Sequence, residues 1–163
     1  MSARQRPMGC RLERLPGAPA WEFVAYPSAV PNLRAAAWAT APGAAEISTD
    51  GSPRRLHFAP GRWLLPDPDR VMHGQLEAAV ASGFGVRLDV EGKWTAILLS
   101  GPDARRALAS TIDIAAVLAN RGCAAVSLFD CPAVAMRDVD RYRLWVAASY
   151  AESIEAAVER LTR

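Results

Sequence analysis

The side chains with the clearest catalytic potential are the two histidines of the chain, His57 and His73. His73 stands four residues after Asp69 and four before Glu77, so a helix would place an imidazole between two carboxylates on one face. Such a group could hold a metal ion or poise a general base. The same spacing occurs on any solvated helix face, and no HExxH pair or further strong ligand stands nearby. We therefore expect an ordinary helix face here, and a packed or edge side chain at His57.

Three cysteines, Cys10, Cys123 and Cys131, are the candidate nucleophiles. Their number is odd, they show no CxxC spacing, and no motif places a histidine beside them. We expect three free thiols, as is usual in a reducing compartment, and buried, inert ones at Cys123 and Cys131. Ser100-Gly101 does not belong to a GxSxG elbow, and Gly83-Phe84-Gly85 lacks the third glycine of a dinucleotide loop, so both predict turns.

No Walker loop and no pair of catalytic carboxylates can be identified. For this chain the sequence therefore predicts no catalytic residues, no cofactor-binding residues and no metal ligands. Enzymes of this size usually carry a local group of titratable residues with a recognisable role. Arginine and tryptophan, both common at interface hot spots, favour a role in protein contacts instead.

The elements that would position these residues fall into two regions. Residues 1–53 are rich in proline and alanine and predict an N-terminal arm with short strands near residues 21–26 and 33–38. Residues 54–163 predict a regular domain. It starts with a strand over 55–65, followed by a helix that Asp67 caps, in which Pro68 is the first helical residue and which Gly83 terminates.

The rest of the chain alternates strands with short helices. Residues 84–90 and 94–99 predict a hairpin closed by Glu91-Gly92. A short helix follows Ser100, and a looser stretch covers 111–121. Strands are expected at 123–129, 133–137 and 142–147, and the S-x-x-E box of Ser149 and Glu152 opens a last helix to about Leu161. This order predicts an α+β fold, with helices on one face of a mainly antiparallel sheet in ferredoxin-like units.

Composition excludes several classes of function. The 163 residues include 19 basic and 17 acidic side chains, for a net charge of +2, and the two signs are interspersed. A dedicated nucleic-acid binder would show clustered excess positive charge, so this class is excluded. The longest apolar run, residues 114–119, is far shorter than the roughly 20 residues that span a bilayer, so no membrane anchor is expected. The first 14 residues lack the apolar stretch of a signal peptide, which favours a cytoplasmic protein.

Several motifs together resemble one family. They are WLL at residues 63–65, LLSGPDAR at 98–105, RGCA at 121–124, YRLWV at 142–146 and SYA at 149–151. In this order they resemble the gamma subunit of heterotetrameric sarcosine oxidase, over about residues 55–161. The leucine-rich strand that ends in Ser-Gly-Pro is shared with the wider aminomethyltransferase-like folate-binding superfamily, part of whose fold the gamma subunit resembles.

The resemblance implies a small subunit of a flavoenzyme complex. Such a complex oxidatively demethylates sarcosine to glycine, with oxygen as electron acceptor and tetrahydrofolate as one-carbon acceptor. In this family the alpha subunit carries NAD and the folate site, beta carries FAD and FMN, and delta binds zinc. The gamma subunit has no assigned cofactor.

Three hypotheses follow from the sequence. The first is a non-catalytic interaction subunit that contacts the alpha and beta, and also delta, subunits of a sarcosine-oxidase-type complex. The alternative is a stand-alone folate or small-molecule binding protein of the aminomethyltransferase-like superfamily. The third is an enzyme that acts through His73 and Glu77.

Overall fold

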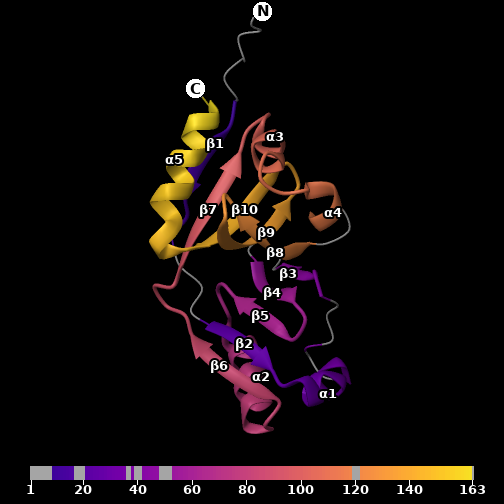
Figure 1. Ribbon diagram of the computed structural model, residues 1–163. Helices are drawn as coiled ribbons and strands as arrows, with labels where there is room; N and C mark the ends of the chain where they lie inside the picture. The colour runs from indigo at the N-terminus through magenta and orange to yellow at the C-terminus, as the bar shows by residue number, and fades with distance from the viewer. Residues whose placement is uncertain are drawn as a thin grey trace, which may run out of the picture.

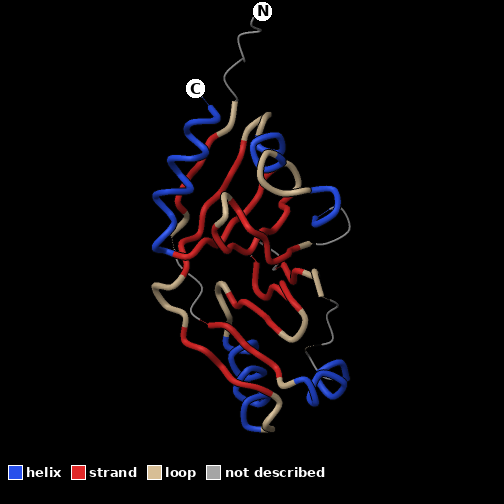
Figure 2. The backbone as a smooth tube through the Cα atoms, viewed as in Figure 1, coloured by secondary structure: helices blue, strands red, loops and turns tan. Residues whose placement is uncertain are grey.

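The computed structural model describes residues 9–16, 21–35, 38, 42–47, 53–118 and 122–162. These residues form two antiparallel sheets of five strands each, with helices on the outer side of both (Figures 1 and 2). The strands of the first sheet, the upper one in Figure 1, are in spatial order β1 (Arg11–Arg14), β7 (Trp94–Ser100), β10 (Arg141–Ala147), β9 (Cys131–Asp138) and β8 (Cys123–Leu128). Those of the second, lower sheet are β3 (Ala45–Ile47), β4 (Pro53–Ala59), β5 (Arg62–Leu65), β2 (Trp21–Ala25) and β6 (Gly85–Asp89).

Five α-helices and two 3-10 turns complete the described part of the chain. The helices are α1 (Val30–Ala35), α2 (Arg70–Ala81), α3 (Ala104–Ala109), α4 (Ile114–Leu118) and α5 (Ala151–Thr162), and the turns are Pro27–Ala29 and Ala148–Tyr150. None of these helices is long and apolar enough to cross a membrane.

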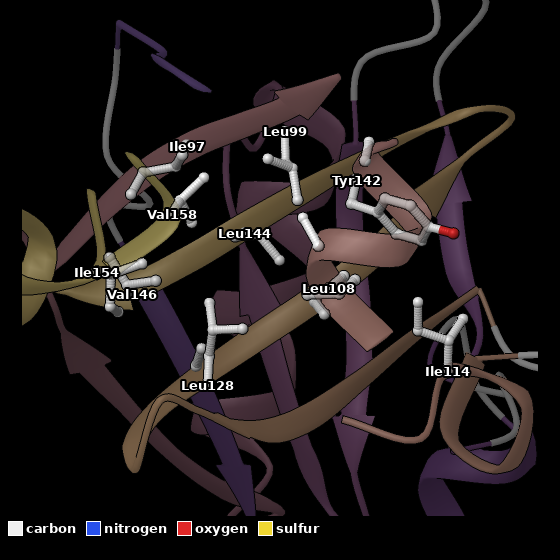
Figure 3. Close-up of a cluster of buried hydrophobic side chains, with 14 of the residues drawn as sticks. Ile97, Leu99, Leu108, Ile114, Leu128, Tyr142, Leu144, Val146, Ile154 and Val158 are labelled. Atoms are coloured by element: carbon white, nitrogen blue, oxygen red, sulfur yellow. The ribbon is translucent and has the colours of Figure 1, made fainter. Parts of the chain in front are cut away.

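Alternating side chains divide the buried apolar residues into three clusters. The outer face of the upper sheet packs against α3, α4 and α5, and Figure 3 shows Val146 of β10 beside Ile154 of α5. The outer face of the lower sheet packs against α1 and α2. A third cluster lies between the sheets and joins Leu56, Phe58 and Leu64 below to Ala96, Cys123, Val134, Met136, Trp94 and Trp145 above. The fold is therefore a four-layer α/β/β/α sandwich, which confirms the predicted α+β class of antiparallel strands with helices on one face, although the strands form two sheets where one was predicted.

Most predicted elements of residues 54–163 are confirmed with small shifts. The five predicted strands after α2 are β6 to β10, the short helix after Ser100 is α3, and the last helix is α5, whose first residue is Ala151. Helix α2 ends just before Gly83, which has a positive φ of 68° as a glycine stop requires. The N-cap predicted at Asp67 is wrong by two residues. The cap is Asp69, whose carboxylate accepts a hydrogen bond from the Met72 N–H at 2.8 Å.

The predicted hairpin at Glu91-Gly92 is wrong. Strand β6 pairs with β2 in the lower sheet, whereas β7 pairs with β1 and β10 in the upper sheet (Figure 1). The chain crosses between the sheets at this turn, and both Val90 and Trp94 are buried in the cluster between them. The Glu91-Gly92 turn therefore joins strands of two different sheets, and its residue types alone do not determine which strands pair.

Three further predictions are corrected. Residues 30–35 form helix α1 where a strand was expected at 33–38, because residues 33–35 (Leu-Arg-Ala) are good helix formers and Pro31 in a first turn loses no helical bond. Residues 36–37 of that expectation lie outside the described residues. The single strand over 55–65 is a hairpin, β4 and β5, that turns at Pro60-Gly61, where Gly61 has a φ of 68°. The loose stretch at 111–121 contains the short helix α4.

Candidate interaction site

The helix face with the predicted acid and base residues is occupied by ion pairs. Asp69 caps α2 and pairs with Arg54, and Glu77 pairs with Arg87 from β6. The ring of His73 packs against Trp21, with 4.7 Å between the ring centroids. No three His, Cys, Asp or Glu side chains in the described part of the chain are grouped to bind a metal ion. Both carboxylates therefore already hold an arginine in place of a metal or a substrate.

The other candidate groups, His57 and the cysteines, are held by packing and hydrogen bonds within the fold. His57 is buried and stacks on Trp63 with 4.1 Å between ring centroids, as expected for a packed residue. All three cysteines are free thiols. Burial raises the pKa of Cys123 to about 12, and its sulfur donates to the Ala44 carbonyl at 3.3 Å. A thiol with such a pKa is protonated at neutral pH and is a poor nucleophile.

The Ser-Gly-Pro turn after β7 holds the start of β1. Gly101 has a φ of 104°, and a Cβ at this position would lie 2.4 Å from the carbonyl oxygen of Gly9. The Gly9 N–H donates to Asp103 of the same turn at 2.7 Å. Only glycine allows this approach, so the turn fixes the N-terminal edge of the upper sheet.

One charged group that the sequence analysis missed lies on the inner face of the lower sheet. Glu22 of β2 has no exposed surface, although its neighbours on the strand are apolar. Arg62 donates to its carboxylate from Nε at 2.9 Å and from Nη2, and Lys93 approaches at 3.4 Å. Lys93 is the only lysine of the chain. A glutamate in a strand of aromatic residues was the available signal, since a buried carboxylate must be paired.

Beyond this ion group, the inner face of the lower sheet carries exposed apolar residues. Glu22 pairs in register with Leu64, which belongs to the buried cluster between the sheets, and with Leu88 on the other side. Leu88 is 40% exposed and Val86, on the same face of β6, is 38% exposed. We call this margin, Val86 and Leu88 with the adjoining Arg62 and Lys93, the open face. The upper sheet contacts the lower one through β8 and β4, at the opposite side of the lower sheet from β6.

The geometry of the open face is typical of an interaction surface. Strand β6 is the edge of its sheet, so it presents unpaired backbone groups as well as apolar side chains. Exposed apolar side chains that adjoin one another and are bordered by charges mark contact sites more often than isolated ones do. A second chain could cover Val86 and Leu88 without disturbing the ion group beside them.

Comparison with solved structures finds a chain of similar fold. A chain of the heterotetrameric sarcosine oxidase from Corynebacterium sp. U-96, solved in complex with pyrrole 2-carboxylate, superposes with a TM-score of 0.70. The match covers 94% of this chain and 86% of that chain, at 19% sequence identity. The chain has the fold of a sarcosine oxidase subunit. No protein-family model matches the sequence, and no curated protein does so either.

The sarcosine oxidase likeness extends further along the chain than the sequence motifs do. The motifs span about residues 55–161, whereas a match over 94% of the chain must also include much of residues 1–53. This agrees with the positions of β1 and β2, one in each sheet. The regulatory subunit of aspartate kinase from Thermus thermophilus also aligns, but its TM-score is 0.42 at 15% identity and it supports no inference.

Proposed function

We propose that this chain is a gamma-type subunit of a heterotetrameric complex of the sarcosine oxidase kind, and that it acts in protein contacts without an active site of its own. The observation that carries this proposal is the likeness of fold, which spans nearly all of both chains. A fold by itself admits many functions, so the surface must agree with the proposal. The open face agrees, because an interaction subunit needs apolar surface that its own fold leaves uncovered.

The chemistry of the proposed complex is the oxidative demethylation of sarcosine to glycine, with tetrahydrofolate as the one-carbon acceptor. We assign FAD, FMN, NAD, tetrahydrofolate and zinc to the other subunits. The described residues of this chain do not fit a metal site, because Asp69 and Glu77, the carboxylates beside His73, are already paired with arginines. The third hypothesis is an enzyme that acts through His73 and Glu77. It is disfavoured because the Glu77 carboxylate is paired with Arg87.

Co-expression tests the proposal directly. The tagged chain is produced with the alpha and beta subunits encoded in the same genome, and the purified material is analysed for stoichiometry and for sarcosine-dependent oxygen consumption. We expect the three chains to co-purify in equal amounts. A chain that is monodisperse alone and leaves alpha and beta in the flow-through would overturn the proposal.

A pair of matched variants tests whether the open face takes part. Leu88→Lys places a charge on the open face, and Ile47→Lys makes the same kind of change at an equally exposed apolar residue of β3, which is 45% exposed. We expect Leu88→Lys to weaken co-purification at least tenfold, since a lysine buried in an apolar contact loses its hydration. Ile47→Lys should co-purify like the unmodified chain. Equal behaviour of the two variants would remove the open face from the interface.

Calorimetry separates this proposal from the stand-alone folate-binding alternative. The isolated chain is titrated with tetrahydrofolate at concentrations up to the millimolar range. An interaction subunit with no folate site gives no heat above dilution. Saturable heat with one site per chain would favour the alternative and contradict the proposal.

A further inference from the structure

A second surface feature lies at the far end of the upper sheet from the open face. Strand β7 runs from the crossing between the two sheets to the Ser-Gly-Pro turn beside α3 (Figure 1), and this turn borders a hollow of about 500 Å³. The turn between β9 and β10 forms the opposite wall. Three arginines from three segments line the hollow, namely Arg105 of α3, Arg137 of β9 and Arg141 of β10. We call it the arginine hollow.

The arginine hollow carries more positive than negative charge. Among the described residues, Asp140 is the one acidic side chain that lines it. Arg141 pairs with Asp138 at 3.1 Å, and Nε of Arg137 donates to the Val139 carbonyl at 3.4 Å. Arg105 has no ion-pair partner among the described residues. Since guanidinium groups match carboxylates in a planar fork, the surface complementary to this hollow is acidic.

The apolar wall of the hollow is a strained valine. Val139 has a φ of 53° and is 78% exposed. A β-branched residue in the left-handed region is unfavourable, and asparagine or glycine would fit the turn without that cost. The turn between β8 and β9 also holds an apolar residue at positive φ, Phe129, but that side chain packs against the upper core. Val139 has no comparable packing, so the folded chain alone gives no reason for a valine here.

We propose that the arginine hollow docks an acidic segment of a partner subunit, with carboxylates on the arginines and an apolar side chain against Val139. The inference rests on the proposed function only in requiring a partner subunit. A small anion is the less suitable occupant, because all three guanidinium groups are exposed and water screens each of them. A small anion would also make no apolar contact with Val139. A protein segment gains from both kinds of contact at once, as interface hot spots do.

Two matched pairs of variants, assayed for binding to the alpha and beta subunits, test the inference. Arg105→Glu reverses a charge in the hollow, and Arg106→Glu reverses its exposed neighbour on α3, which does not line the hollow. Val139→Asn removes the apolar wall, and Val71→Asn removes a valine of α2 that is 67% exposed. Each variant is titrated with purified alpha and beta subunits by biolayer interferometry at low and high salt, and its thermal midpoint is recorded.

We expect Arg105→Glu and Val139→Asn each to weaken binding at least tenfold, and the two control variants to bind as the unmodified chain does. Salt should weaken binding less for Arg105→Glu than for the other variants, because this variant has lost an attraction that salt screens and has gained a repulsion that salt also screens. Val139→Asn should unfold at a higher temperature than the unmodified chain while binding more weakly. This opposite change separates a contact residue from a structural one.

Three results would overturn the inference. If Arg105→Glu bound as tightly as Arg106→Glu, the hollow would not face a partner, and the proposed function would stand unchanged. If the unmodified chain failed to bind alpha and beta, the proposed function and this inference would both fall. If the isolated chain bound citrate with micromolar affinity and Arg105→Glu abolished that binding, the hollow would be a small-anion site.

Discussion

The buried carboxylate of Glu22 predicts an unequal response to the loss of its two charges. Glu22 has no exposed side-chain surface, whereas the side chain of Arg62 is 46% exposed and that of Lys93 is 49% exposed. Arg62→Met removes the closer cation and leaves the carboxylate buried. Glu22→Gln removes the buried charge and leaves two cations that can turn toward water. The arginine substitution should therefore cost more stability than the glutamate substitution.

The size of this difference follows from the geometry. An uncompensated buried charge costs about 3–5 kcal/mol, and Lys93 at 3.4 Å compensates part of it, so we expect Arg62→Met to cost about 2–3 kcal/mol. Glu22→Gln loses charge-assisted hydrogen bonds to half-exposed partners, which is worth about 1 kcal/mol after screening. At about 2–4 °C per kcal/mol for a chain of this length, the melting temperature should fall by about 4–12 °C and by about 2–4 °C respectively.

Urea and thermal unfolding of the isolated variants measure these values. Arg87→Met is the matched control, because the pair of Arg87 with Glu77 is exposed on both sides and its loss should change stability little. The double variant Arg62→Met with Glu22→Gln should be more stable than Arg62→Met alone. The reasoning fails if Glu22→Gln costs as much as Arg62→Met, or if the double variant is no better than the single arginine variant.

Two further predictions concern the turn after β7 and the buried thiol. The methyl group of Gly92→Ala meets nothing within 4 Å, so this control should lower the free energy of unfolding by about 1 kcal/mol because of its φ of 74°. The methyl group of Gly101→Ala also meets the Gly9 carbonyl, so this variant should lose at least about 1 kcal/mol more in urea unfolding and show faster hydrogen exchange in β1. Equal costs would show that the approach of Gly9 does not constrain the turn. Because its pKa is about 12, Cys123 should resist iodoacetamide at pH 8 until the chain unfolds, whereas the half-buried Cys131 reacts in the native protein, as mass spectrometry would show. The raised pKa also lowers stability as pH rises from 9.0 to about 12, since only the unfolded chain releases the proton there, and Cys123→Ala should flatten that part of the profile.

Local patterns were sufficient for most of the elements after residue 54. Alternating side chains located β6, a short apolar run located β7, and helical spacing with a glycine stop located α2, because these patterns follow from backbone geometry within one segment. The same patterns could not choose partners for the strands. The predicted hairpin at Glu91-Gly92 failed because the chain passes there from one sheet to the other, and burial between the sheets decides that path.

The candidate surfaces were less accessible to sequence reasoning. Glu22, Arg62 and Lys93 are far apart in the chain and meet only because β2 lies between β5 and β6. The arginine hollow likewise depends on β7 and β9 ending, and β10 beginning, at the same side of the upper sheet. Charge counts along the sequence cannot reveal either group, since both combine segments that only strand order brings together.

The sequence by itself therefore determined the class of fold, the buried surroundings expected for Cys123 and His57, and a resemblance that the fold then supported, whereas the burial expected for Cys131 is wrong because that side chain is only partly buried. Each of these depends on residue types and spacing within short segments. Only the tertiary structure decided that the strands divide into two sheets, that Glu22 is buried between charges, and that apolar side chains stay exposed on β6. The physical reason is that strand pairing and burial depend on contacts between segments that are distant in the chain. The residue pattern of one segment does not determine which other segment it contacts.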